Sequence, residues 1–272
     1  MYRQFFGFSE DPFNITPDPQ FLFLSKEHNA AFTLLRYGLE ESKGFMVITG
    51  EVGCGKTLLC RALLQSLDEH LFETAWLYSS NITQEQLIRS ILKEIGMPAS
   101  KLPETDHFEA LNEYLLAKIN KGKKILLIID EAQNLSYELL ESIRLLSNLE
   151  TAQRKLLQIL LVGQPELKVK LNQPQLRQLK QRILVYYELN PLDKKDTLNY
   201  INHRLNLVCQ QPGLPKISYT AFNSIYKYSK GIPRVINNVC DKALMATYAH
   251  LGKRVDKKDV VQAIKDIERL SL

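Results

Sequence analysis

The residues of this chain best suited to chemistry form a glycine-rich segment that fits the phosphate-binding pattern G-x-x-x-x-G-K-[ST]. In such loops backbone N–H groups surround phosphate oxygens, the lysine reaches the β- and γ-phosphates, and the next hydroxyl ligates Mg²⁺. We therefore expect Lys56 to bind the phosphates of ATP and Thr57 to bind Mg²⁺. The segment and the residue after it are Gly50, Glu51, Val52, Gly53, Cys54, Gly55, Lys56, Thr57 and Leu58.

The segments on either side of this loop support the interpretation. The apolar run 45–49 predicts a buried strand that leads into the loop. The helix predicted to begin near Lys56 would direct its positive N-terminus at the anion. Cys54 fills a free position of the pattern and needs no chemistry.

An acidic pair, Asp130 and Glu131, follows the apolar run 125–129, which is typical of a parallel strand buried on both faces. A carboxylate at this place holds the metal through water, so Asp130 is the predicted metal-side acid. Glu131 is the predicted base that polarises the attacking water, which favours hydrolysis over binding alone. The alternative is an acidic pair that only keeps the strand end soluble.

Three further segments predict strands, at residues 74–78, 156–163 and 184–189. Thr83 with Gln86 three residues later predicts a helix that opens with a capping box. The predicted order inserts one strand between the phosphate loop and the acidic strand. That insertion is characteristic of the P-loop ATPases that use a catalytic glutamate.

The segment 191–272 has a helical pattern. Helices are predicted to begin at Asp193, Ser218 and Asp256, and the sequence G-I-P-R at residues 231–234 introduces a long amphipathic run to residue 250. Pro233 suits the first turn of that helix because its missing N–H has no helical partner there.

This order resembles AAA+ proteins, and the resemblance implies three further roles. Gln164, directly after the strand 156–163, takes the place of a sensor that hydrogen-bonds the γ-phosphate or the attacking water. Arg182, just before the last strand, takes the place of an arginine that reaches into a neighbouring subunit's site, with Arg177 as the alternative. Arg234 takes the place of a second sensor that contacts the γ-phosphate. Without the resemblance, these would be a turn residue and surface charges.

The motifs together resemble the general secretion pathway protein A family of AAA+ ATPases, whose short relatives serve mannose-sensitive haemagglutinin pilus biogenesis. The resemblance covers nearly the whole chain. It implies an ATPase associated with the inner membrane that helps to build the channel of type II secretion or a related pilus. The motifs that carry it are MYRQFFGF at 1–8, PF at 12–13, TPDP at 16–19, GEVG at 50–53, DEAQ at 130–133, VGQPEL at 162–167 and GIPR at 231–234.

The resemblance also implies a domain organisation. We expect a three-layer α/β domain with a parallel sheet at residues 1–189 and a small α-helical lid at residues 190–272. The family's N-terminal segment, residues 1–25 here, suggests an adenine contact through Phe13 and Ile15. Full-length members continue into a transmembrane helix and a periplasmic peptidoglycan-binding domain, so we expect a short paralogue or a truncated chain.

Composition is consistent with a cytoplasmic protein, to which the resemblance adds a peripheral place at the inner membrane. No apolar run approaches the roughly 18 residues that span a bilayer, and an N-terminus with Glu10, Asp11 and Pro12 is not a signal peptide. Four scattered cysteines and five histidines without ligand spacing predict reduced thiols and no zinc. Residues 98–103, which begin and end with proline, predict a loop between helices.

The net charge of +5 is unevenly distributed. Residues 190–272 contain 14 Lys and Arg against 7 Asp and Glu, whereas residues 1–189 contain 21 against 23. A basic lid can be a solvated helical face, or it can bind anionic lipid or nucleic acid. The predicted partners are further copies of the chain, through Arg182, and an inner-membrane secretion or pilus assembly protein.

Two other functions remain open from the sequence. A DNA-binding AAA+ regulator of transposition type has the same architecture, although no recognition module follows the predicted lid. A nucleotide-dependent scaffold that hydrolyses little ATP would differ in rate and not in sequence.

Overall fold

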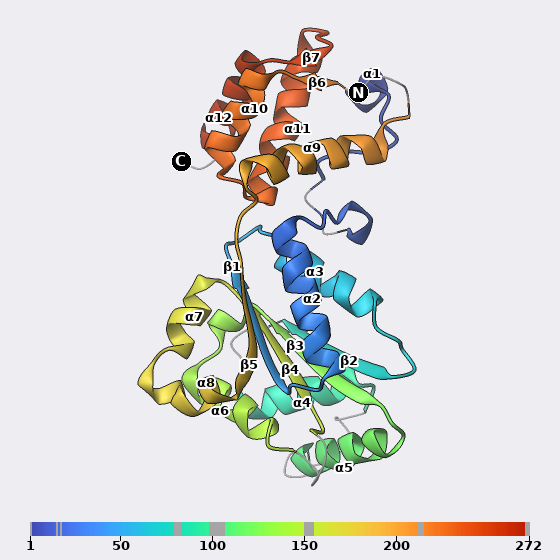
Figure 1. The fold of residues 1–272 in the computed structure, drawn as a ribbon, viewed down its shortest axis with the longest axis vertical. Coiled ribbons are helices and arrows are strands. Elements are labelled where there is room, and N and C mark those ends of the chain that lie inside the picture. The colour runs from blue at the N-terminus through green and yellow to red at the C-terminus, as the bar shows by residue number, and fades with distance from the viewer. Residues whose placement is uncertain are drawn as a thin grey trace. The chain divides into compact units, whose positions relative to one another are not determined.

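The computed structural model of this chain describes residues 2–14, 16, 18–78, 83–97, 107–149, 155–210 and 215–269. It divides into two compact units. We call residues 30–50 and 59–189 the sheet unit, and residues 1–29, 51–58 and 190–272 the helical unit (Figure 1). Ile15 and the predicted loop at 98–103 lie outside the described residues. The predicted domain boundary after residue 189 stays a prediction.

The sheet unit is built on five parallel strands in the order β2-β3-β4-β1-β5. Every residue of β1 and β4 is buried, which explains their continuous apolar runs. Leu156 and Leu157, predicted as part of β4, are buried but lie before its first residue, Gln158. An apolar run indicates burial, but it does not show where strand pairing begins. The strands are β1 (Phe45–Gly50), β2 (Phe72–Tyr78), β3 (Lys124–Asp130), β4 (Gln158–Gly163) and β5 (Ile183–Leu189).

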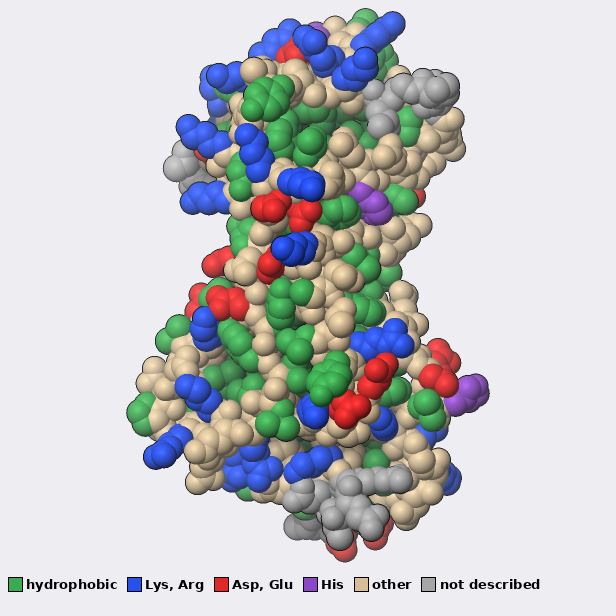
Figure 2. All heavy atoms as spheres, viewed as in Figure 1, with side chains coloured by type: hydrophobic (Ala, Val, Ile, Leu, Met, Phe, Trp, Pro, Cys, Tyr) green, Lys and Arg blue, Asp and Glu red, His purple; other side chains and the backbone are tan. Residues whose placement is uncertain are grey.

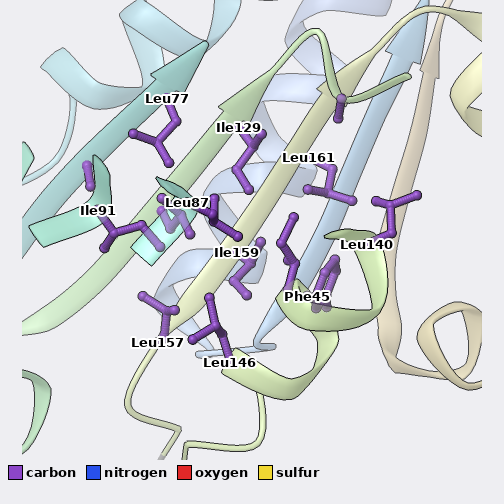
Figure 3. Close-up of a cluster of buried hydrophobic side chains, with 14 of the residues drawn as sticks. Phe45, Leu77, Leu87, Ile91, Ile129, Leu140, Leu146, Leu157, Ile159 and Leu161 are labelled. Carbon is purple, nitrogen blue, oxygen red and sulfur yellow. The ribbon is translucent and has the colours of Figure 1, made fainter. Parts of the chain in front are cut away.

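Helices cover both faces of this sheet, so the predicted three-layer α/β fold class is confirmed. Side chains of β1 alternate between the faces: Phe45 joins the cluster of Figure 3 with residues of α4 and α6, whereas Met46 lies against Gly38 of α2. The helices are α2 (Lys26–Glu40), α3 (Lys56–Gln65), α4 (Gln84–Glu94), α5 (His107–Asn120), α6 (Tyr137–Leu146), α7 (Pro165–Leu171) and α8 (Arg177–Arg182), with short 3₁₀ turns η4 (Ala132–Asn134) and η5 (Pro174–Leu176).

Local capping signals explain where several helices begin. The capping box predicted at Thr83 is present, because the Thr83 hydroxyl accepts from the Gln86 N–H and the Gln86 side chain accepts from the Thr83 N–H. Asp193 and Ser218 cap their helices as predicted, and Pro233 occupies the first turn of its helix.

The helical unit packs its helices around a second apolar cluster. A short parallel pair, β6 (Lys216–Ile217) and β7 (Arg254–Val255), joins two of its loops. Its helices are α1 (Tyr2–Phe6), α9 (Lys194–Val208), α10 (Tyr219–Ser229), α11 (Pro233–Ala249) and α12 (Lys257–Arg269), with a 3₁₀ turn η1 (Pro19–Phe21). Among the described residues, no helix is both long enough and apolar enough to cross a membrane.

The N-terminal segment is an integral part of the helical unit. Arg204 of α9 is buried, donates to the carbonyl oxygens of Pro12 (2.6 Å) and Asn14 (2.8 Å), and stacks 4.2 Å from the centre of the Phe21 ring. The guanidinium group is planar and carries several N–H donors, so it can donate to two carbonyl oxygens and stack on an aromatic ring at the same time. Burial lowers the pKa of Arg204 from its ordinary value.

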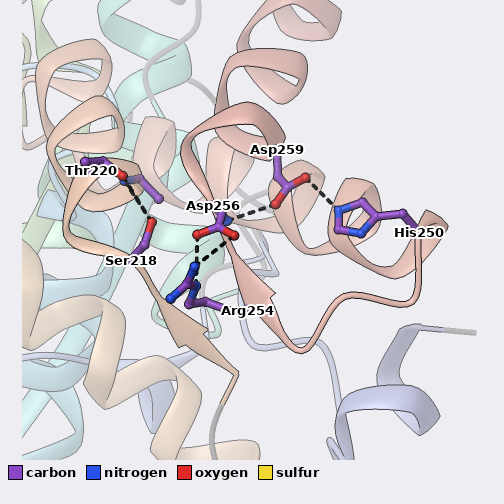
Figure 4. Close-up of polar contacts among 7 residues, drawn as sticks. Ser218, Thr220, His250, Arg254, Asp256 and Asp259 are labelled. Atoms are coloured by element: carbon purple, nitrogen blue, oxygen red, sulfur yellow. Dashed lines mark hydrogen bonds and ion pairs between the residues drawn. The ribbon is translucent and has the colours of Figure 1, made fainter.

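A polar cluster closes the loop between α11 and α12 (Figure 4). Asp259 accepts from the backbone N–H of Asp256 (2.9 Å) and pairs with the imidazole of His250 (2.9 Å). Arg254 pairs with the Asp256 carboxylate at 2.9 Å. The Asp259 carboxylate therefore receives an N–H that the start of a helix leaves without a helical partner.

Candidate nucleotide-binding site

The phosphate loop has the left-handed backbone that its glycines permit. Gly53 has φ +83° and Gly55 has φ +96°, values that other residues rarely adopt. The loop closes on itself through the Cys54 N–H, which donates to the Glu51 carbonyl oxygen at 3.2 Å. Lys56 begins α3, and its Nζ donates to the same carbonyl oxygen at 3.1 Å. Thr57 is the second residue of that helix.

Arg234, the predicted second sensor, lies beside this loop within the helical unit. Its backbone N–H donates to the Gly53 carbonyl oxygen at 3.2 Å. A Cβ atom on Gly53 would lie 2.5 Å from the Cβ of Arg234, so the close approach requires glycine. The Arg234 side chain is exposed at the start of α11.

His28 is a contact of the phosphate loop that the sequence did not reveal. Its Nε2 lies 2.9 Å from the Cys54 carbonyl oxygen, which can only accept, so Nε2 carries the proton. Its Nδ1 lies 2.7 Å from the Ser25 hydroxyl. Burial lowers the pKa of His28, which keeps the ring neutral at pH 7. A single histidine in the first turn of an amphipathic helix gives no signal by itself.

A small, mostly apolar pocket adjoins the phosphate loop in the helical unit. Its aromatic side chains come from two segments far apart in the sequence, the η1 region and α9. Phe13, predicted to contact adenine, is buried in the apolar cluster of the same unit. The pocket is lined by Phe21, Leu22, Phe23, His28, Cys54, Gly55, Leu58, Leu192, Tyr200 and Pro233.

The sheet unit brings the predicted catalytic side chains to one edge of the sheet. Register pairs Ile129 of β3 with Leu161 of β4, so Asp130, the last residue of β3, and Gln164, directly after β4, lie at the carboxyl ends of neighbouring strands. Asp130 is buried, and its Oδ1 accepts from the Glu131 N–H at 2.9 Å. Gly50 ends β1 at the same edge, where Thr49 pairs with Gly163.

Glu131 is held by two amide side chains. It has φ +53°, an uncommon left-handed conformation for a residue that is not glycine, and its side chain is exposed. Its Oε2 accepts from Gln133 Nε2 at 2.6 Å and from Gln164 Nε2 at 3.1 Å. The predicted base and the predicted sensor are thus in direct contact. Gln133 belongs to the D-E-A-Q motif at 130–133, but the sequence did not predict its contact with Glu131.

The two arginines considered for a neighbouring subunit's site differ in exposure. Arg182 ends α8, is half-buried, and donates from Nη1 to the Ser147 hydroxyl at 3.1 Å. Arg177 begins the same helix and is exposed.

The predicted metal ligands are a hydroxyl at Thr57 and a carboxylate at Asp130, and both are hard oxygen donors of the kind that Mg²⁺ prefers. Within the described ranges no three His, Cys, Asp or Glu side chains group in a way that could hold a metal ion. A complete protein cage is not required, because Mg²⁺ in phosphate sites takes one or two protein ligands and completes its shell with phosphate and water.

Comparison with known proteins identifies a similar domain family and similar chains. Residues 39–171 match the AAA domain family. The chain is 42% identical over 270 residues to the general secretion pathway protein A of Aeromonas hydrophila. That match covers 98% of this chain, which spans 48% of the length of the relative.

Solved structures share the fold at low sequence identity. The ORC2 protein of Aeropyrum pernix in its ADP form has a TM-score of 0.70 and 17% identity, and the match covers 95% of this chain and 73% of that one. Cdc6p from Pyrobaculum aerophilum has a TM-score of 0.71 and 16% identity, with 95% and 71% covered. The RuvB Holliday junction branch migration motor of Thermotoga maritima has a TM-score of 0.53 and 16% identity, with 87% and 68% covered.

Proposed function

Because this chain belongs to the AAA ATPases of the general secretion pathway protein A type, we propose that it binds ATP with Mg²⁺ and hydrolyses the γ-phosphate bond. The observation that carries this proposal is the polar group at the carboxyl edge of the sheet. There a buried acid, Asp130, is followed by Glu131 in a left-handed conformation, held by two amides. Carboxylates placed in this way serve metal binding and general-base catalysis.

Each predicted residue has a role in this proposal. Lys56 and the loop 50–58 bind the phosphates, Thr57 and Asp130 hold Mg²⁺, and Glu131 accepts the proton of the attacking water. Bound Mg²⁺ supplies charge compensation on the phosphate oxygens. Three further side chains are assigned to the γ-phosphate: Gln164 and Arg234 of the same chain and Arg182 of a neighbouring one.

A base site is supported by the pocket beside the phosphate loop. Its Phe21, Phe23 and Tyr200 side chains give the pocket an aromatic, apolar lining of the kind that suits a nucleotide base. The contact of Phe13 and Ile15 with adenine stays a prediction from the family's N-terminal segment.

Two substitutions test hydrolysis by separating binding from chemistry. Lys56→Ala should abolish tight binding of a fluorescent ATP analogue, because it removes the cation on the phosphates. Glu131→Gln should still bind the analogue but release phosphate at least about 10²-fold more slowly than the parent, because a positioned base usually contributes a factor of this size. Hydrolysis by Glu131→Gln at the parental rate would show that Glu131 is not the base. A parental protein that binds ATP with negligible turnover would favour the scaffold function.

We further propose that ATP turnover drives assembly of a type II secretion or pilus machine, from a cytoplasmic position peripheral to the inner membrane. The 42% identity to a protein named for general secretion supports this process. Lys and Arg side chains spread over the part of the helical unit formed by α10 to α12, which suits a membrane surface of anionic lipid (Figure 2). The alternative is a DNA-binding regulator of transposition type.

Vesicle flotation and DNA binding distinguish these two partners. Vesicles rich in phosphatidylglycerol should carry the protein at physiological salt, and DNA binding should weaken steeply between low and physiological salt, as for unspecific phosphate contacts. Charge reversal at Lys257 and Lys258, which are exposed on α12, should reduce flotation. Submicromolar, ATP-dependent DNA binding at physiological salt without flotation would overturn the membrane proposal.

A further inference from the structure

Gln133 connects the two side chains that the proposed hydrolysis depends on most. Its Nε2 donates to Glu131 Oε2 at 2.6 Å, and its Oε1 accepts from the backbone N–H of Gln164 at 3.0 Å. We propose that Gln133 is the positioning residue that sets the orientation of the Glu131 carboxylate and couples it to Gln164. This inference rests on the proposed ATPase function.

The orientation of the Gln133 amide follows from the backbone. The Gln164 N–H can only donate, so the oxygen of the amide must face it, and the NH₂ group must face Glu131. The hydrogen bond from the Gln164 N–H, directly after β4, therefore determines that the Gln133 NH₂ group faces the Glu131 carboxylate, directly after β3. No local preference of the D-E-A-Q segment could specify this, because the partner lies 31 residues away.

The turn that carries Gln133 is itself fixed. Lys170 of α7 donates from Nζ to the carbonyl oxygens of Gln133 (2.6 Å) and Leu135 (2.7 Å), and both Ala132 and Leu135 are buried. The amide also has little room, because a Cβ atom on Gly163 would lie 3.1 Å from Gln133 Oε1. A side chain fixed at both ends is suited to hold a neighbouring carboxylate in one place.

The arrangement also separates the tasks of the two glutamines. Both donate to the same oxygen of Glu131, but only Gln164 is assigned to the γ-phosphate. When the Gln164 amide turns to the phosphate, Gln133 keeps the carboxylate in position for the attacking water. Loss of Gln133 should therefore lower kcat while leaving ATP affinity nearly unchanged.

Gln133→Glu is the sharpest test because it preserves shape and changes one hydrogen bond. One carboxylate oxygen can still accept from the Gln164 N–H, whereas the other faces Glu131 with no proton to donate. At about pH 7.5 we expect kcat to fall about 10- to 100-fold, the cost of a misplaced catalytic group, with ATP affinity within about 3-fold of the parent. Toward about pH 5.5 one proton shared by the two carboxyl groups restores the bond, so kcat relative to the parent should rise.

The nucleotide-free protein provides a readout that does not depend on hydrolysis. Two facing carboxylates repel when both are ionised, so Gln133→Glu should have a lower Tm than the parent at about pH 7.5, and the difference should shrink toward about pH 5.5. Gln133→Leu should lower kcat at every pH without this dependence. Gln175→Glu, at an exposed position of the same unit, should match the parent in both measurements.

The outcomes distinguish this inference from the proposed function. Parental kcat and a parental pH profile of Tm in a folded Gln133→Glu protein would overturn the role of Gln133. A fall in kcat of Gln133→Glu that stays constant with pH would do the same, since a structural defect has no reason to be repaired by one proton. If the parent itself lacks ATPase activity but the Tm difference still shrinks with falling pH, the contact stands and the proposed function fails.

Discussion

Single residues in the helical unit shape the phosphate loop from outside the motif that identifies it. His28 donates to a loop carbonyl oxygen from Nε2, and its Nδ1 lies 2.7 Å from the Ser25 hydroxyl, which donates to Nδ1 when the ring is neutral. Protonation of the ring would place a positive charge in a buried setting and would require the Ser25 hydroxyl to change from donor to acceptor. The loop is therefore coupled to the protonation state of one histidine.

We expect this coupling to appear as a pH dependence of stability. Burial lowers the pKa of His28 in the folded protein, so below about pH 6.5, the ordinary value of histidine, the unfolded chain binds the proton first and the folded state loses stability. His28→Gln keeps an N–H donor for the Cys54 carbonyl oxygen but cannot titrate. Urea unfolding of both proteins between about pH 7.5 and 5.5 should show a smaller loss for His28→Gln.

The matched control for that experiment is His70→Gln, since His70 is exposed. It should follow the parent at every pH. Equal losses in the parent and His28→Gln would show that the His28 contact does not control the stability of the loop.

At the scale of elements, the start of α12 depends on one buried carboxylate. The side chain of Asp259 is 4% exposed and that of His250 is 42% exposed. Burial alone would raise the pKa of Asp259, but hydrogen bonds from the Asp256 N–H, His250 and Thr247 hold it below its usual range. The ionised carboxylate is thus part of the folded structure of this helix start.

Asp259→Asn should destabilise the protein in a pH-dependent way. The amide oxygen can still accept one N–H, so we expect a cost of about 1 kcal/mol at pH 7, from the lost charge at the helix N-terminus and toward His250. Because the folded pKa is lowered, the contribution of Asp259 is complete above about pH 4 and is lost as the pH falls below it. Thermal unfolding near pH 7 and near pH 3.5 measures the difference.

Asp266→Asn, on the same helix but half-exposed, should cost less, and an equal cost for both variants would argue against the special role of Asp259.

At the scale of the whole molecule, the proposed site is incomplete without a second copy. Arg182 is tied to Ser147 of its own chain, and in the proposed assembly its guanidinium would exchange that hydroxyl for the γ-phosphate of a neighbour. The single chain should then be a poor ATPase, with a specific activity that rises with protein concentration.

Mixing two inactive variants tests action between subunits. Arg182→Ala keeps an intact phosphate loop and Lys56→Ala keeps an intact arginine, so mixed interfaces should recover part of the activity that neither variant has alone. Phosphate release is measured across mixing ratios, with co-assembly followed by light scattering. Co-assembly without any recovery would move the assignment to Arg177, which is exposed.

Much of the fold was determined by short-range pattern in the sequence. Buried parallel strands appear as continuous apolar runs because both faces are covered, so the ends of β1, β3 and β4 were predictable to within two residues. The caps at Thr83, Asp193 and Ser218 were predictable for a similar reason, since a cap bonds to N–H groups two or three residues away. The phosphate loop carries its own signal in consecutive residues.

Only the tertiary structure decided which side chains meet around these motifs. His28 contacts Cys54 across 26 residues, Gln133 contacts Gln164 across 31, and Arg204 contacts Pro12 across 192. Each contact depends on strand register or helix packing, which bring together groups whose own types carry no information about their partners. A glutamine two positions after Glu131 is an ordinary polar residue until β3 and β4 are aligned, because only that alignment places a backbone N–H on one side of its amide and a carboxylate on the other.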